Sequence, residues 1–155
     1  MNSRITTLLV LLMVLLVNSC ENETSAKNEA EPAEIDLVKV RILLQELDDQ
    51  FSKSFNNADS VAIAEHYSID GTFGSIKGKD NLISAWGKSI RYANENGTPN
   101  VKFKISSVSN DGEFVVEIGS FEFSDINNIV KSTGKYLVVR KLEDGKWKMY
   151  RDIGL

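Results

Sequence analysis

Apolar side chains recur at steps of three and four residues early in the chain, the spacing of one stripe along an amphipathic helix. Charged and amide residues, Asp48 among them, fall mostly between these positions. The spacing predicts a long helix over 35–57, ended by Asn56-Asn57, because asparagine tolerates the left-handed backbone found past helix ends. The stripe consists of Leu37, Val40, Leu44, Leu47, Phe51 and Phe55.

Two shorter helices are predicted after this one. Asp59 or Ser60 can cap a helix that reaches about residue 66, and Asp80 can cap another over 81–95. These side chains accept hydrogen bonds from the free N–H groups at a helix start. Between the two helices, residues 67–73 predict a short strand with a turn at Asp70-Gly71.

The pattern changes to strict alternation beyond residue 100, which indicates half-buried strands. Gly119 interrupts the strand predicted over 113–124, and a glycine inside a strand often marks a bulge or a bend. The chain closes on two apolar runs that flank Asp144-Gly145, a pair that supplies the positive φ of a tight hairpin turn. Helices followed by a four-stranded antiparallel meander predict an α+β domain with helices on one face of the sheet.

The N-terminus has a different character from the rest. Residues 1–19 carry Arg4 and then an uncharged run from Leu8 to Val17. A charged start and an apolar core of ~10 residues are typical of a secretion signal, and that core is shorter than the ~20 residues that a membrane-spanning helix needs.

Cys20 follows this segment directly, and its setting resembles a bacterial lipobox, where a signal peptidase cleaves and a lipid is attached to the cysteine. Residues 20–34 are acidic and polar, which is typical of a flexible tether. We therefore expect a signal peptide (1–19), a tether (20–34) and a folded domain (35–155). The expected location is the bacterial cell envelope, lipid-anchored to a membrane, on the periplasmic or surface side of the outer membrane. The alternative is an ordinary secreted protein with a spare thiol.

Composition narrows the function classes. The net charge is −4 and the basic residues are scattered among acids, which argues against a nucleic-acid partner. The chain has one histidine, which excludes a multi-histidine metal site, and one cysteine, which excludes an internal disulfide. The sequence shows neither a serine–histidine–acid triad nor a glycine-rich phosphate loop. We therefore expect no metal and no cofactor.

Several segments, taken in order and with their spacing, resemble the nuclear-transport-factor-2-like superfamily, which includes SnoaL-like and ketosteroid-isomerase-like domains. The resemblance implies a cone-shaped, strongly bent antiparallel sheet wrapped around the long N-terminal helix, with two shorter helices. A cavity at the open end of the cone would then be the place for a small molecule. The segments that carry the resemblance are 55–59, 66–73, 78–80, 134–140 and 144–153.

Two residues are candidate acid–base groups. The resemblance places Asp152 near the mouth of the cone, where an apolar pocket raises a carboxyl pKa and suits it to remove a proton from carbon next to a carbonyl. The alternative is an ion pair with Arg151 or Arg140, or simple exposure. His66 titrates near neutrality, and its alternative is a helix-end histidine bonded to the backbone.

Six further residues are candidate ligand contacts. The hydroxyls of Tyr67, Tyr136 and Tyr150 can donate hydrogen bonds to a ligand, or these rings can belong to the core. Trp86 is expected in the core or in the cavity wall. Arg140 binds a ligand carboxylate if its strand face is concave and is solvated if it is convex, and Glu117 on the neighbouring strand is the residue that can instead neutralise it.

The leading hypothesis is an envelope-anchored lipoprotein that binds a small hydrophobic molecule. The sequence leaves open whether the domain is an enzyme. One alternative is SnoaL-like or ketosteroid-isomerase-like acid–base chemistry on a small carbonyl compound, with Asp152 or His66 as the base. The other is a protein-interaction module, because members of the superfamily often form homodimers through the outer face of the sheet.

Overall fold

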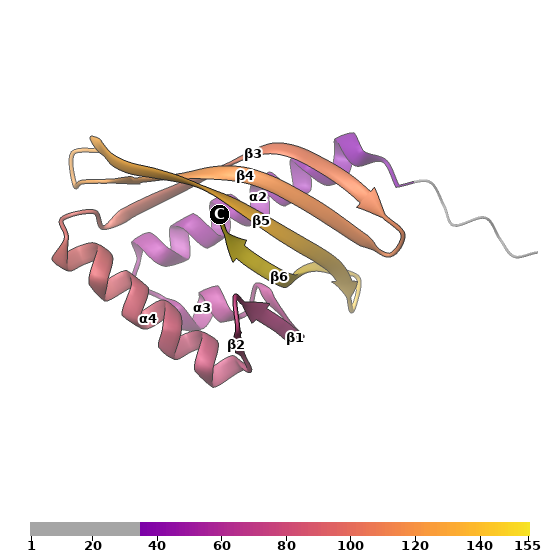
Figure 1. Cartoon of the computed structure of the whole chain (residues 1–155), viewed down its shortest axis with the longest axis horizontal. Helices are drawn as coiled ribbons and strands as arrows, with labels where there is room; N and C mark the ends of the chain where they lie inside the picture. Colours follow the sequence, from indigo (N-terminus) through magenta and orange to yellow (C-terminus); the bar gives the residue numbers. More distant parts are fainter. Residues whose placement is uncertain (1–34) are drawn as a thin grey trace, which may run out of the picture. The chain divides into compact units, whose positions relative to one another are not determined.

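The structure is a computed structural model that describes residues 35–155; the predicted signal peptide, the tether and Cys20 lie outside the described residues. The described part is an α+β domain with a curled, unclosed sheet, as the sequence predicts (Figure 1). Its elements are α2 (Leu37–Asn56), α3 (Ser60–Ala64), β1 (Tyr67–Phe73), β2 (Ile76–Lys77), α4 (Lys79–Glu95), β3 (Asn100–Asp111), β4 (Phe114–Ser124), β5 (Val130–Glu143) and β6 (Lys146–Gly154).

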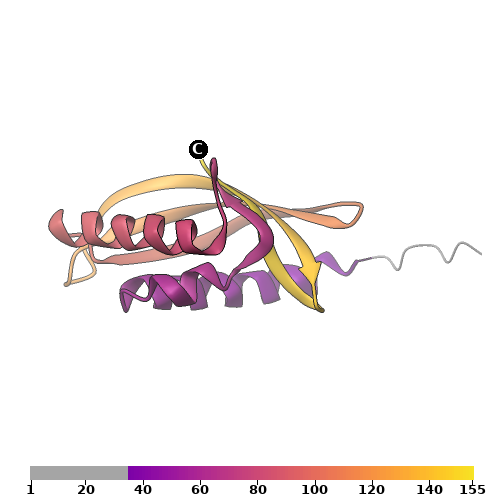
Figure 2. The same cartoon turned by 90° about the horizontal axis from the view of Figure 1, so that it is seen from below.

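The sheet has six strands in the order β2-β1-β6-β5-β4-β3. Strands β3 to β6 form the predicted antiparallel meander. Strand β1 extends it by pairing parallel to β6, and the short β2 pairs antiparallel to β1, so the sheet is not antiparallel throughout. The three helices lie on one side of the curled sheet, seen from two directions in Figure 1 and Figure 2. Among the described helices, none is both long and apolar enough to cross a bilayer.

Helix α2 begins and ends close to the predicted positions. Asp36 caps it by accepting hydrogen bonds from the N–H groups of Val38 and Lys39, both at 3.2 Å. The buried stripe includes Leu44, Phe51 and Phe55, as predicted, but it also includes Asp48. The sequence pattern had placed Asp48 on the polar side, and this is corrected by the structure.

Two local predictions after α2 are wrong. Helix α4 is capped by Gly78 at φ 87° without a side-chain hydrogen bond, and Asp80 lies in its first turn. Strand β1 continues through Asp70-Gly71 without a turn, although its pairing with β6 is irregular between Tyr67 and Thr72, and the positive φ of 55° belongs to Gly74. Gly71 instead permits close packing on β6, because a Cβ there would lie 2.6 Å from the Met149 carbonyl oxygen.

Gly119 has a packing role in addition to its place at a bend. The pairing of β3 with β4 shifts register between Ile105 and Ser107, beside Gly119, so the additional residue belongs to β3. A Cβ on Gly119 would lie 2.4 Å from the ring of Tyr136 on β5. The missing side chain therefore makes room for Tyr136 to lie over the sheet.

The closing hairpin has the predicted turn. Asp144 and Gly145 both have positive φ, 52° and 72°, which suits a tight turn between right-twisted strands. The turn sets the pairing of β5 with β6 from Glu143↔Lys146 to Arg140↔Met149, beyond which the register shifts.

Candidate functional site

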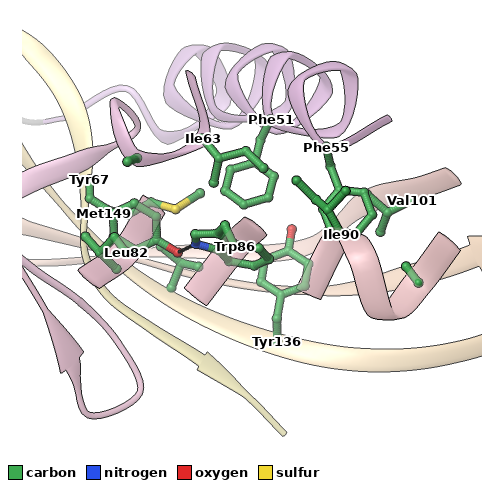
Figure 3. Packing of buried hydrophobic residues seen from close by; sticks show 13 residues of the cluster. Phe51, Phe55, Ile63, Tyr67, Leu82, Trp86, Ile90, Val101, Tyr136 and Met149 are labelled. Atoms are coloured by element: carbon green, nitrogen blue, oxygen red, sulfur yellow. Dashed lines mark hydrogen bonds between the residues drawn. The ribbon is translucent and has the colours of Figure 1, made fainter. Parts of the chain in front are cut away.

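A cavity of about 220 Å³ lies between α2, α4 and the concave face of the sheet. Its wall is largely aromatic. Trp86 stacks on Phe73 with ring centroids 4.5 Å apart and meets Phe51 edge-on at 5.0 Å; Figure 3 shows Trp86, Phe51 and Tyr136 converging from three different elements. The lining rings are Phe51, Phe55, Phe73, Trp86, Phe103, Phe121, Phe123 and Tyr136.

Asp152 is one of two carboxyl groups in this wall, the other being Asp48. Strict alternation from Trp147 and Met149 would turn Asp152 outward. The pairing of β5 with β6 shifts between Val139 and Arg140, which leaves Tyr150 as an extra residue in β6. Such a bulge re-aims the side chains that follow it, and Asp152 consequently faces the cavity with 8% of its surface exposed.

Asp152 is held by a short relay of hydrogen bonds. The Tyr67 hydroxyl donates to Asp152 Oδ2 at 2.5 Å, and Trp86 Nε1 donates to the Tyr67 oxygen at 3.1 Å. Burial raises the pKa of Asp152 to about 6, although the Tyr67 hydrogen bond and the Arg140 charge act to lower it. The group is thus able to gain or lose a proton close to neutral pH.

A buried charge cluster lies next to this group. Arg140 donates from Nε to Glu117 Oε2 at 2.7 Å and from Nη2 to Asp48 Oδ1 at 2.5 Å. The Tyr136 hydroxyl donates to Asp48 Oδ2 at 2.8 Å. Burial and the Glu117 charge raise the pKa of Asp48 well above its usual range, more than Arg140 lowers it. Asp48 therefore holds its proton more tightly than an exposed aspartic acid does.

The structure brings six of the eight sequence-predicted catalytic and ligand-contact residues together. Trp86, Tyr136 and Asp152 line the cavity, while Tyr67, Glu117 and Arg140 are buried behind it and hydrogen-bonded to lining residues or to one another. The strand face of Arg140 is the concave one, but both of its charged partners come from the protein itself.

His66 and Tyr150 do not line the cavity. The ring of His66 packs 5.5 Å from that of Phe51, and burial, with Arg140 and Lys148 nearby, lowers its pKa to about 4. Tyr150 stacks on Phe114 at 5.4 Å, and the Arg151 guanidinium lies 3.5 Å from its ring centre.

Asp48 is the site residue that sequence reasoning missed. It lies four positions after Leu44 and three before Phe51, which is on the apolar stripe itself. An acidic residue on an apolar stripe is either buried with a partner or exposed by a bend in the helix. The sequence therefore does contain a signal that marks Asp48 as unusual. Within residues 35–155, no three His, Cys, Asp or Glu side chains gather as a metal-binding group.

Comparison with known proteins shows the fold. No protein-family model and no curated protein matches the chain. A "NTF-2 like protein of unknown function" from Shewanella oneidensis is 16% identical, with a TM-score of 0.57, over 76% of this chain and 98% of its own. A protein of unknown function "with a cystatin-like fold" from Nostoc punctiforme is 15% identical, with a TM-score of 0.58, over 77% of this chain and 91% of its own. A Catenulispora acidiphila chain solved "in complex with S-DNPA" is 8% identical, with a TM-score of 0.56, over 76% of this chain and 91% of its own.

Proposed function

We propose that this domain, whose fold is that of the nuclear-transport-factor-2-like proteins, binds a small, largely apolar molecule in the cavity between α2, α4 and the sheet. The observation that carries the proposal is the cavity itself. Eight aromatic side chains line this volume of about 220 Å³, together with two carboxyl groups. An apolar cavity with a few placed polar groups is the usual form of a small-molecule site. The Catenulispora acidiphila chain of the same fold, solved "in complex with S-DNPA", is consistent with this proposal.

Thermal unfolding with a set of one-ring aromatic and alicyclic compounds tests the proposal. A ligand at one hundred times its Kd stabilises the folded state by about 2.7 kcal/mol, which is roughly 10 °C for a domain of this size. Ser89 lines the cavity from α4, and Ser84 lies exposed on the same helix. We expect Ser89→Trp to abolish the shift and Ser84→Trp to leave it intact. If no compound stabilises the wild-type protein, the proposal is wrong.

Acid–base catalysis is the second candidate, and the raised pKa of Asp152 favours it. A buried carboxyl group with a pKa of about 6 beside a cavity can act as a base near neutral pH. His66 does not line the cavity, and we therefore drop it as the base. If a turnover is found, Asp152→Asn should abolish it and His66→Ala should not. Unchanged turnover in Asp152→Asn rules out this mechanism.

The proposed setting is the bacterial cell envelope, with the domain anchored through a lipid on Cys20. This part of the proposal rests on the N-terminal sequence pattern. Cys20→Ala should move the protein from the membrane fraction to the soluble fraction, whereas Ser25→Ala in the tether should not. Retention of the Cys20→Ala variant in the membrane fraction contradicts the lipid anchor.

A further inference from the structure

The carboxyl groups of the described cavity wall have no basic side chain beside them in the lining. Asp48 and Asp152 are the lining residues with ionisable acidic groups, and the lining contains no Lys, Arg or His. The cation that lies behind the wall, Arg140, is fully buried and bonded to Glu117 and Asp48. A ligand carboxylate would therefore find no free cation in the described wall and would approach two acidic groups instead.

Asp152 has one oxygen left for a ligand. Tyr67 donates to Oδ2, and none of the hydrogen bonds within residues 35–155 reaches Oδ1. Because Oδ1 is not among the buried atoms that lack a partner, it keeps contact with the cavity or solvent. Burying an ionised carboxylate in apolar surroundings costs free energy when it has no partner. A cation that donates a hydrogen bond to the carboxylate lowers this cost.

The rest of the wall suits the same kind of ligand. Aromatic faces attract a cation placed over them, and the attraction grows as water is excluded. The volume matches a molecule with a single ring, since a cavity of about 150 Å³ already holds benzene and this one has about 220 Å³.

We propose that the cavity selects small protonated amines that carry one aromatic or alicyclic ring, with the ammonium group bonded to Asp152 and the ring among the aromatic side chains. This inference rests on the proposed ligand binding and deepens it by naming the ligand class. The charges that face Asp152 are Arg140 on β5 and Glu117 on β4, together with the Tyr67 hydroxyl on β1. Of these, Arg140 is already paired with Glu117 and Asp48, and the Tyr67 hydroxyl donates a hydrogen bond to Asp152.

Calorimetric titration of the full chain at pH 7.5 with three probes of one skeleton tests the inference. The probes are 2-phenylethylamine, 2-phenylethanol and 3-phenylpropanoate. We expect the amine to bind at least tenfold more tightly than the alcohol and the carboxylate to show no binding. Since Asp152 has a pKa of about 6, its ionised fraction falls about tenfold from pH 7 to pH 5, and amine affinity should fall with it while alcohol affinity stays constant.

The variant Asp152→Asn removes the carboxylate charge and keeps the size of the side chain. It therefore tests whether the ammonium charge, and not the shape of the ligand, gives the preference for the amine. It should bind the amine no more tightly than the alcohol, and a cooperative urea unfolding transition shows that the variant is folded. Equal wild-type affinities for amine and alcohol, or tighter binding of the carboxylate, overturn the inference and leave the proposed function standing. Absence of binding by all three probes, together with no response to the one-ring compounds tested above, overturns both.

Discussion

At the scale of single residues, Asp48 and Asp152 are the two carboxyl groups that folding removes from water at the cavity wall. Burial is the largest cause of the raised pKa in both. Each is stabilised by a tyrosine that donates a hydrogen bond, Tyr136 to Asp48 and Tyr67 to Asp152. Such groups lower the stability of the fold in their ionised form, and a ligand that compensates them recovers that free energy.

This environment makes stability depend on the protonation of Asp152. Its pKa is about 6 in the folded protein and 3.8 as the ordinary value, so the folded state holds the proton more tightly. Protonation of Asp152 therefore contributes fully to the free energy of unfolding below about pH 4. This contribution, about 3 kcal/mol, is lost as the pH rises through 6.

We therefore expect Asp152→Asn, which cannot ionise, to be more stable than the wild type at pH 7.5. Its free energy of unfolding, measured by urea denaturation, should be higher by about 1–3 kcal/mol. At pH 4 this advantage should vanish. Asp70→Asn is the control, because a hydrogen bond from Lys141 lowers the pKa of this exposed group and its replacement should give no gain at pH 7.5. The same difference between Asp152→Asn and wild type at both pH values would contradict the assignment.

At the scale of elements, the cavity depends on irregularities in the strands. The bulge at Tyr150 lets Met149 and Asp152 both face inward from β6. The missing side chain at Gly119 on β4 admits the ring of Tyr136 from β5. Without these two features, regular strands would expose Asp152 and displace the hydroxyl that bonds Asp48.

Gly119→Ala tests the second feature. The new Cβ would lie 2.4 Å from the Tyr136 ring, so either the ring or the strand must shift. We expect a loss of about 1–3 kcal/mol in the free energy of unfolding, the usual cost of overpacking, measured by urea denaturation. Gly154→Ala on β6 is the matched control, since its Cβ would meet no atom within 4 Å. Equal stability of the two variants would show that Tyr136 has room to move.

At the scale of the whole folded domain, the convex side of the sheet carries an aliphatic row. Ile118 pairs with Leu137, and Leu137 pairs with Ile153, so the three side chains lie side by side on β4, β5 and β6. Ile118 is 37% exposed and Ile153 is 44% exposed. The resemblance to the superfamily implies a homodimer through this outer face, and the row supplies apolar area for one.

We expect the protein to sediment as a dimer at micromolar concentration. The double variant Ile118→Lys/Ile153→Lys should sediment as a monomer, because two buried ammonium groups on each side would be uncompensated. Ile69→Lys is the control, since Ile69 is 89% exposed on β1 at a different site. A wild-type monomer at high concentration would rule out the homodimer.

The α+β class, the order of the elements and most of their bounds could be predicted from the amino-acid sequence. This was possible because helical stripes, strand alternation and turn residues are local properties. The stripe from Leu37 to Phe55 predicts α2, and Asp144-Gly145 predicts the final turn. The resemblance to a known superfamily added the curvature of the sheet and the presence of a cavity, and the tertiary structure agrees with both.

Contacts between distant segments set which charged groups meet, and these contacts could not be predicted from local patterns. Asp48 has the spacing of the apolar stripe, but its charge assigned it to the polar side of α2, and alternation alone would put Asp152 outside β6. Their burial follows from the non-local meeting of residues 48, 117 and 140, and from a one-residue bulge that shifts the pairing of β6. A buried acid is tolerated where a partner from a distant segment reaches it, and that partner is set by strand register, which no local pattern encodes.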